Sequence, residues 1–182
     1  MGAIVVTGVP GVGKTTVMTA AAEAKKLKIV VFGTVMFEIA QKAHKVKSRD
    51  EMRKLPPETQ KQVQRQAARE IAYLGDVIVD THCTVKTAKG YLPGLPAWVL
   101  ESLKPSVIVL VEAEPTEIFG RRARDATRDR DTENIQDIER HQELNRAAAM
   151  AYATLTGATV KVVFNHDNRV QDAIQQILPV VQ

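Results

Sequence analysis

The sequence predicts an α/β fold in which helices cover a parallel sheet of five strands. One observation is that five short apolar runs, rich in β-branched residues, alternate with stretches of helical composition or periodicity. A second is that the first run leads directly into a glycine-rich loop, which an alanine-rich helical segment follows. Strand and helix in this alternation are typical of βαβ units, whose strands are parallel and buried on both faces.

Composition places the chain among ordinary globular proteins. Its 182 residues are 45% hydrophobic and 25% charged, which suits one domain over residues 1–182. No apolar run approaches the ~20 residues of a membrane span and no basic leader comes first, so we expect a soluble intracellular protein without a membrane partner. The lone Cys83 is expected to pack rather than to act as a nucleophile. The net charge of +4 permits either nucleic acid or a small anionic ligand.

The glycine-rich loop spans residues 8–15, and its sequence Gly-Val-Pro-Gly-Val-Gly-Lys-Thr has the spacing of a phosphate-binding loop, or P-loop. Its glycines allow backbone N–H groups to point into one concavity at the positive end of the following helix. There Lys14 would reach the β- and γ-phosphates of a nucleotide, and the Thr15 hydroxyl would ligate Mg²⁺. The alternative is a glycine-rich turn before an ordinary helix, which the strand at 3–7 and the helix from 16 to 26 disfavour.

The later elements are predicted from apolar runs and from residues that begin or end helices. Strands are expected at 28–32, 76–80, 106–111 and 158–164. Helices are expected at 34–43, with Thr34 as its cap, at 58–74, 96–103, 135–155 and 170–178, and from Pro115 onward. The glycine- and proline-rich stretch 81–96 is expected to be a loop.

Polar residues follow the carboxyl ends of two predicted strands, where open α/β sheets bind ligands. Asp80 ends the third strand and would hold Mg²⁺ through water or contact a substrate, although an aspartate that only caps the next turn is the alternative. His82 is either a substrate contact or a hydrogen-bonding loop histidine. The Gly33-Thr34 turn ends the second strand and is a further candidate ligand contact.

An arginine-rich segment begins inside the helix that Pro115 opens. Five arginines fall within ten residues, at 121, 122, 124, 128 and 130, with aspartates at 125, 129 and 131 among them. Such a segment is often only a solvated helix, but arginines also stabilise a transferring phosphoryl group, and a segment that closes over the site would exclude water. The alternative is a nucleic-acid track together with the basic residues of 42–54, which the 4% aromatic content disfavours.

Several segments spread over nearly the whole chain have distinctive sequences. They are Gly-Val-Pro-Gly-Val-Gly-Lys-Thr-Thr at 8–16, Phe-Gly-Thr-Val-Met-Phe-Glu at 32–38, Arg-Asp-Glu-Met-Arg-Lys-Leu at 49–55, Val-Asp-Thr-His at 79–82, Thr-Val-Lys-Thr at 84–87, Lys-Gly-Tyr-Leu-Pro-Gly-Leu-Pro at 89–96 and Leu-Thr-Gly-Ala-Thr-Val-Lys at 155–161. Together they resemble the nucleoside monophosphate kinases and, more closely, the archaeal-type adenylate kinases. The P-loop is shared widely, whereas the segments at 32–36 and 89–96 are far more particular.

This resemblance implies a P-loop three-layer sandwich with strand order 2-3-1-4-5 and the Mg²⁺-dependent reaction ATP + AMP ⇌ 2 ADP. It also implies a cytoplasmic homotrimer, an AMP-binding helical part over about 33–75 and a short arginine-rich lid over about 121–134. It places the catalytic cations at Lys14, Arg122, Arg128, Arg130 and Arg140. It places ATP on Gly8, Val9, Pro10, Gly11, Val12, Gly13, Lys14, Thr15, Thr16 and Asn168. It places AMP on Gly33, Thr34 and the loop from Asp80, where His82 and Tyr91 are candidate contacts. Arg53 and Lys86 are further candidate contacts of AMP, and Thr15 and Asp80 are the candidate ligands of Mg²⁺.

One departure from the family pattern concerns the AMP phosphate. Most adenylate kinases follow the third-strand aspartate with Gly-Phe-Pro-Arg, whose arginine holds this phosphate, whereas Thr-His-Cys-Thr stands here at 81–84. The candidate replacement cations are Arg53, Lys86 and Lys89. Two other functions stay open, a P-loop ATPase that acts on RNA or in ribosome assembly and a kinase of a small metabolite.

Overall fold

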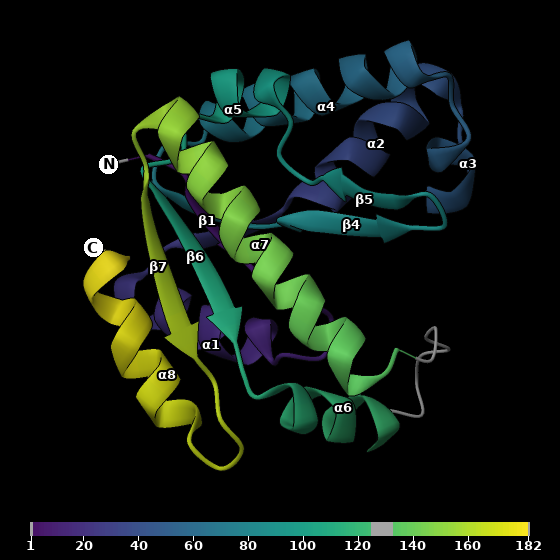
Figure 1. Ribbon diagram of the computed structural model, residues 1–182. Coiled ribbons are helices and arrows are strands. Elements are labelled where there is room, and N and C mark those ends of the chain that lie inside the picture. Colours follow the sequence, from purple (N-terminus) through teal and green to yellow (C-terminus); the bar gives the residue numbers. More distant parts are fainter. Residues whose placement is uncertain (1, 125–132, 182) are drawn as a thin grey trace.

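The computed structural model describes residues 2–124 and 133–181 and contains a parallel five-stranded sheet (Figure 1). Its strands are β1 (Ile4–Thr7), β2 (Lys28–Val31), β3 (Val77–Asp80), β6 (Val107–Glu112) and β7 (Thr159–Phe164). Their order across the sheet is β2-β3-β1-β6-β7, and neighbouring strands are parallel. Counted along the chain without the separate hairpin described below, this is the order 2-3-1-4-5, so the expected topology is confirmed.

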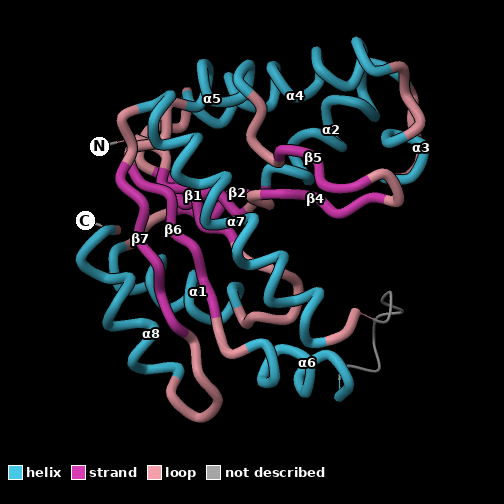
Figure 2. Tube along the Cα trace, in the orientation of Figure 1, coloured by secondary structure: helices cyan, strands magenta, loops and turns pink. Residues whose placement is uncertain are grey.

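Helices cover both faces of the sheet, which makes three layers (Figures 1 and 2). The helices are α1 (Lys14–Lys25), α2 (Phe32–His44), α3 (Arg49–Arg53), α4 (Pro57–Ala72), α5 (Ala97–Leu103), α6 (Pro115–Arg124), α7 (Ile135–Thr156) and α8 (Val170–Ile177), and the 3₁₀ turn η1 (Leu178–Val180) follows. α1 and α8 pack on one face, whereas α2, α4, α5 and most of α7 pack on the other.

Strand β1 shows why the sheet needs both layers. Val5 is buried in the core that contains α2, α4 and α7, while Ile4 and Val6 are buried in the core that contains α1 and α8. Successive strand residues point to opposite faces, so a strand covered on both sides has to be a continuous apolar run. In the register with β3, Val6 lies opposite Asp80. The end of β3 therefore lies beside the start of the P-loop.

The stretch 81–96 is a hairpin and not the expected loop. Strands β4 (Thr84–Thr87) and β5 (Gly90–Pro93) pair antiparallel around a two-residue turn. The return is tight, because a Cβ on Gly94 would lie 1.9 Å from the carbonyl oxygen of His82. The prediction was wrong because the glycines and prolines that indicated a loop instead allow this close hairpin.

Two smaller differences concern the chain after β2. Helix α2 begins at Phe32, with Val31 at its N-cap and no side-chain cap, so Thr34 is not the cap that the sequence predicted. The basic stretch after α2 contains the short helix α3, whose N-cap Ser48 accepts a hydrogen bond from the Glu51 N–H at 3.1 Å. Thr34 instead lies inside the first turn of α2.

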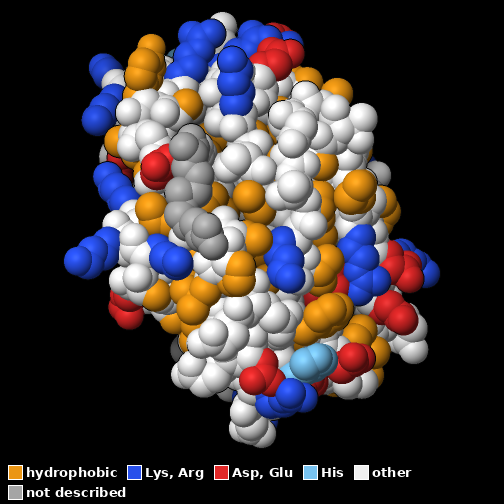
Figure 3. Space-filling view, turned by 90° about the vertical axis from the view of Figure 1, so that its left-hand side faces the viewer, with side chains coloured by type: hydrophobic (Ala, Val, Ile, Leu, Met, Phe, Trp, Pro, Cys, Tyr) orange, Lys and Arg blue, Asp and Glu red, His pale blue; other side chains and the backbone are white. Residues whose placement is uncertain are grey.

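The surface carries charges of both signs. Figure 3 shows the side of the molecule that lies on the left in Figure 1, where lysines and arginines are spread among hydrophobic side chains. Acidic and basic side chains gather around a histidine at its lower end. None of the described helices has the length and apolar character that crossing a membrane requires.

Candidate active site

Glycines shape the P-loop at positions where another residue would be strained or would collide. Gly11 and Gly13 have φ angles of +87° and +85°, in the left-handed region that favours glycine. A Cβ on Gly8 would lie 2.5 Å from a carbonyl oxygen of β6, and one on Gly13 would lie 2.4 Å from the side-chain nitrogen of Asn165. Helix α1 begins at Lys14, so its unpaired N–H groups and positive end face the loop.

A cleft of about 1030 Å³ lies beside the P-loop. Its walls come from the loop, from the start of α2, from α3 and α4, from the end of β3, from the hairpin and from α6. The predicted site residues that line it are Gly8, Val9, Pro10, Gly11, Val12, Gly13, Lys14, Thr15, Gly33, Arg53, Asp80 and His82. The structure thus brings the loop and most of the predicted acceptor-side residues into one cavity.

Lys14 and Asp80 form an ion pair in this cleft. The Lys14 ammonium donates to Asp80 Oδ1 and, at 3.0 Å, to the carbonyl oxygen of Thr81. The two side chains are only 14% and 19% exposed, and charges in such a partly dehydrated place interact more strongly than at an open surface. The cation of the P-loop is therefore tied to the end of β3.

Thr15 and Asp80 are the candidates for holding a magnesium ion, and both line the cleft. Within residues 2–124 and 133–181, no cluster of three or more His, Cys, Asp or Glu side chains could hold a metal by itself. Mg²⁺ usually keeps several waters and binds one or two protein oxygens together with substrate phosphates. A hydroxyl and a carboxylate beside a phosphate-binding loop fit this preference.

The residues that follow β3 have different environments. His82 lines the cleft, where desolvation and the nearby Lys14 ammonium lower the pKa of its imidazole. Cys83 is buried and its thiol donates to the carbonyl oxygen of Asn145 at 3.3 Å. Burial raises the pKa of this thiol to about 12, so it is not a nucleophile at neutral pH. The prediction that Cys83 packs is confirmed.

One face of the hairpin belongs to the cleft. Val85, Thr87 and Leu92 line the cavity. Because neighbouring strand residues point to opposite faces, Lys86 and Tyr91 project from the other face, and the lining residues do not include them. The structure therefore does not bring these two predicted AMP contacts together with the rest of the site.

The other face of the hairpin packs against α7 through buried polar side chains. Thr84 Oγ1 donates to Asn145 Oδ1 at 2.7 Å and lies 3.1 Å from His141 Nε2. Since Thr84 has a single hydroxyl proton, His141 must donate from Nε2, which assigns the tautomer of a neutral imidazole. Its Nδ1 atom has no partner in the described part of the chain, and burial lowers the pKa of the ring. The ring of Tyr91 meets His141 edge-on, with 5.0 Å between centroids.

Other predicted site residues lie away from the cleft lining. Thr16 on α1, Arg140 on α7 and Asn168 in the β7–α8 loop are exposed, and none of them lines the cavity. Asn168 has a φ of +59°, in the left-handed region. Arg128 and Arg130 lie outside the described residues.

Among the described residues, two arginines of α3 line the cleft, and only Arg53 was predicted as a site residue. The other is Arg49, whose NH2 donates to Thr34 Oγ1 at 2.9 Å and so lies beside the predicted Gly33-Thr34 contact. Arg53 pairs with Asp50 at 2.9 Å on the exposed side of α3. Arg49 could have been suspected from its place in the same basic stretch, but nothing in the sequence showed which side chains of that stretch face the cleft.

Arg121 and Arg122 bring α6 onto the P-loop. Arg121 NH1 donates to the carbonyl oxygen of Val12 at 3.0 Å, and Arg122 Nε donates to that of Pro10 at 2.7 Å. Arg121 also lines the cleft, whereas Arg122, which was predicted as a catalytic cation, is not among the lining residues. Adjacent helical residues point about 100° apart, so the sequence alone could not decide which arginine faces the cavity.

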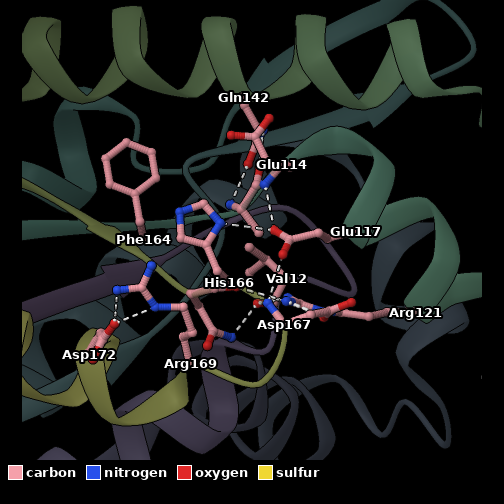
Figure 4. A network of polar contacts seen from close by, with 12 residues as sticks. Val12, Glu114, Glu117, Arg121, Gln142, Phe164, His166, Asp167, Arg169 and Asp172 are labelled. Carbon is pink, nitrogen blue, oxygen red and sulfur yellow. Dashed lines mark hydrogen bonds and ion pairs between the residues drawn. The ribbon is translucent and has the colours of Figure 1, made fainter.

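Figure 4 shows the contacts that hold the β7–α8 loop to α6. The Glu117 carboxylate accepts from the N–H groups of Asp167 at 2.7 Å and Glu114 at 3.0 Å, and it hydrogen-bonds His166 Nδ1 at 3.1 Å. Arg121 Nε donates to Asp167 Oδ1 at 2.7 Å. Burial alone would raise the pKa of Glu117, but these hydrogen bonds outweigh it and lower the pKa. The loop is thus anchored by an ionised carboxylate.

The fold and the site together define a P-loop kinase, with a glycine-shaped loop after β1 and a lysine and a threonine at the head of α1. Residues 7–139 match the profile of a family described as an AAA domain. The shikimate kinase of Acinetobacter baumannii, solved with shikimate, superposes with a TM-score of 0.63 over 100% of this chain and 93% of its own. At 16% identity, this likeness concerns the fold alone.

Two relatives identify the family. The adenylate kinase of Methanothermobacter thermautotrophicus is 54% identical to this chain over the full length of both. The adenylate kinase of Methanopyrus kandleri is 55% identical over 98% of this chain and 97% of its own. The chain belongs to the adenylate kinase family, and it is accordingly a nucleotide-binding phosphotransferase.

Proposed function

We propose that this protein catalyses the reversible, Mg²⁺-dependent transfer of the γ-phosphoryl group of ATP to AMP, which yields two ADP. The observation that carries the proposal is the one cleft that contains both a P-loop and a separate arginine-bearing wall. A kinase that joins two nucleotides needs an anion-binding loop for the donor and a cationic surface for the phosphate of the acceptor. The names of the relatives support the same reaction.

The donor phosphates are proposed to lie against the N–H groups of the P-loop, at the head of α1. Lys14, Arg121 and Arg122 then supply positive charge around the phosphoryl group, whose transition state spreads negative charge over its equatorial oxygens. The acceptor oxygen belongs to a phosphate that is already anionic at neutral pH, so the reaction needs no dedicated general base.

Mg²⁺ is proposed to be held by the Thr15 hydroxyl and, through water, by Asp80. When bound, the ion neutralises charge on the β- and γ-phosphates and helps to orient them. Lys14 contributes to the same arrangement, because its ammonium fixes the Asp80 carboxylate within the cleft.

AMP is proposed to occupy the wall formed by α2, α3 and α4 together with the end of β3. Its phosphate is assigned to Arg49 or Arg53, because both line this part of the cleft. Lys86 is less suited, since its ammonium pairs with Glu133 at 2.9 Å on the far face of the hairpin. His82 is proposed as a hydrogen-bonding contact, because it lines the same part of the cleft.

We further propose a short lid over about 121–134, an AMP-binding part over about 33–75, and Arg128, Arg130 and Arg140 as cations of the lid and its flank. Closure of such a lid would exclude water from the phosphoryl group. A cytoplasmic homotrimer is proposed from the sequence resemblance. Light scattering during size-exclusion chromatography tests the trimer, which should have three times the chain mass of 20.0 kDa.

The decisive experiment incubates the purified protein with ATP, Mg²⁺ and each nucleoside monophosphate in turn, and separates the products by chromatography. The expected result is ADP formation that depends on AMP and on Mg²⁺, with little free phosphate. A parallel arm replaces AMP with RNA, because a P-loop ATPase acting on RNA would release phosphate and be stimulated. Phosphate release without AMP would reject the proposal, and transfer to a different monophosphate would correct its acceptor.

A further inference from the structure

Glu133 lies where three parts of the structure meet. It stands just before α7, and its carboxylate accepts from Lys86 Nζ of the hairpin at 2.9 Å through Oε1. Oε2 accepts from Arg122 NH1 of α6 at 2.5 Å. The carboxylate is therefore shared between the hairpin and the helix whose arginines touch the P-loop.

Arg122 is held on two sides. Its Nε donates to the carbonyl oxygen of Pro10 at 2.7 Å, and its NH1 donates to Glu133. The side chain is only 10% exposed, and its NH2 is buried without a hydrogen-bond partner among residues 2–124 and 133–181. A buried guanidinium nitrogen normally has a partner, so this NH2 keeps a donor that none of the described residues uses, although Arg122 is not among the residues that line the cleft.

We propose that Glu133 is a positioning residue for phosphoryl transfer. Its carboxylate holds Arg122 against the P-loop and, through Lys86, fixes the position of the hairpin relative to α6. The proposal rests on the proposed function and adds to it the residue that orients one of its cations. Arg122 is a flexible side chain, and fixing it before the reaction removes an entropic cost that would otherwise be met in the transition state.

The ion pairs of Glu133 differ from ordinary surface ion pairs in burial and in the number of partners. Exposed pairs contribute little, but the Glu133 side chain is only 11% exposed and has two cationic partners. Burial alone would raise the pKa of its carboxyl, yet the hydrogen bonds from Lys86 and Arg122 lower it, so the group is ionised at neutral pH. Its negative charge also opposes binding of a nucleotide phosphate nearby. Removing that charge should therefore slow the chemical step without weakening nucleotide binding.

The chain offers a matched control. Glu112 is buried, with a side chain 3% exposed, and it forms a bidentate pair with Arg146 at 2.5 to 3.0 Å. This pair joins β6 to α7, and neither residue lines the cleft. Glu112→Gln therefore breaks another glutamate–arginine pair outside the site, in which the glutamate is buried and the Arg146 side chain is 51% exposed.

The test compares wild type, Glu133→Gln, Glu112→Gln, Lys86→Met and the double variant Glu133→Gln/Lys86→Met. It measures the thermal midpoint, the KM for ATP and AMP, and the single-turnover rate of ADP formation, because product release can limit kcat. Glu133→Gln is expected to lower the single-turnover rate about tenfold while both KM values stay unchanged or fall. Glu112→Gln is expected to lower the thermal midpoint but to keep the wild-type rate.

Introduced into the wild type, Lys86→Met should lower the single-turnover rate about threefold. Introduced into the Glu133→Gln variant, it should not change the rate, because Lys86 is proposed to act only through Glu133. A wild-type rate in Glu133→Gln, with only the thermal midpoint lowered, would overturn the proposal. If Glu133→Gln does not fold, an unchanged rate in Lys86→Met overturns it instead. Absence of AMP-dependent ADP formation in the wild type would reject the proposed function itself, and this inference with it.

Discussion

Arg121 NH1 and the carbonyl oxygen of Val12 lie 3.0 Å apart, although 109 positions separate the two residues in the chain. The same oxygen accepts a second hydrogen bond from the Asn165 side chain at 2.8 Å. Arg121 also donates to the carbonyl oxygen of Asn165 at 2.8 Å, so the P-loop, the helix before the arginine segment and the β7–α8 loop share one set of contacts. The conformation of the P-loop therefore depends on side chains far from its own motif.

Arg121→Met keeps the length of the side chain and removes its donors. A hydrogen bond from a charged group contributes about 1.5–3 kcal/mol, so we expect the KM for ATP to rise at least tenfold while the KM for AMP changes little. Steady-state kinetics with each substrate varied in turn measures the effect. The exposed Arg69 on α4 supplies the control Arg69→Met, which should behave as wild type. An equal rise of both KM values would contradict a role confined to the donor side.

Lys14→Ala removes the cation of the P-loop. We expect kcat to fall by about 100-fold or more, because one positioned charge near the phosphoryl group typically contributes on this scale. The thermal midpoint should fall only by a few degrees, since the Asp80 carboxylate loses a partner but stays partly hydrated. Circular dichroism and the coupled ADP assay test both parts, with Lys25→Ala at the end of α1 as the control. Near-normal turnover in a folded Lys14→Ala protein would contradict the assignment of the loop.

Comparing Gly13→Ala with Gly157→Ala distinguishes the cost of backbone strain at a positive φ from an effect on ATP binding by the P-loop. Both glycines have a positive φ, so each alanine should cost roughly 1–2 kcal/mol of stability. At Gly157 no atom lies within 4 Å of the added methyl group, whereas at Gly13 it would displace the Asn165 amide. We expect kcat/KM for ATP to fall more than tenfold only in Gly13→Ala, when denaturation and kinetics are measured on both variants. Normal kinetics in Gly13→Ala would show that Asn165 does not support the loop.

His141 predicts how stability changes in mild acid. Its folded pKa is lowered, so between about 6.5 and that lower value the unfolded chain binds more protons and stability falls as the pH falls. His141→Gln can still donate to Thr84 but does not titrate. We expect the free energy of unfolding in urea to decrease less in His141→Gln than in wild type between pH 7.5 and pH 5. If the free energy of unfolding changed equally with pH in both proteins, the acid response would come from groups other than His141.

Much of the fold could be predicted because apolar runs and helix signals report burial directly. The hairpin could not, because its strands are four residues long and depend on contacts with α7 such as that between Thr84 and Asn145. In the site, the P-loop and Asp80 could be predicted from the sequence, because the P-loop is a continuous motif and Asp80 directly ends an apolar run. The contacts of Arg121 and Glu117 could not be predicted, because their partners lie in the β7–α8 loop, which only folding brings near them.

The two-faced hairpin has a consequence for how such an enzyme could change its acceptor. Val85, Thr87 and Leu92 border the cavity, while Thr84 and Tyr91 anchor the same strands to α7. Substitutions at the bordering positions can therefore change the shape of the cleft without disturbing the contacts with α7. Natural drift or laboratory selection could thus alter one wall of the cleft through a few side chains and leave the scaffold and the P-loop unchanged.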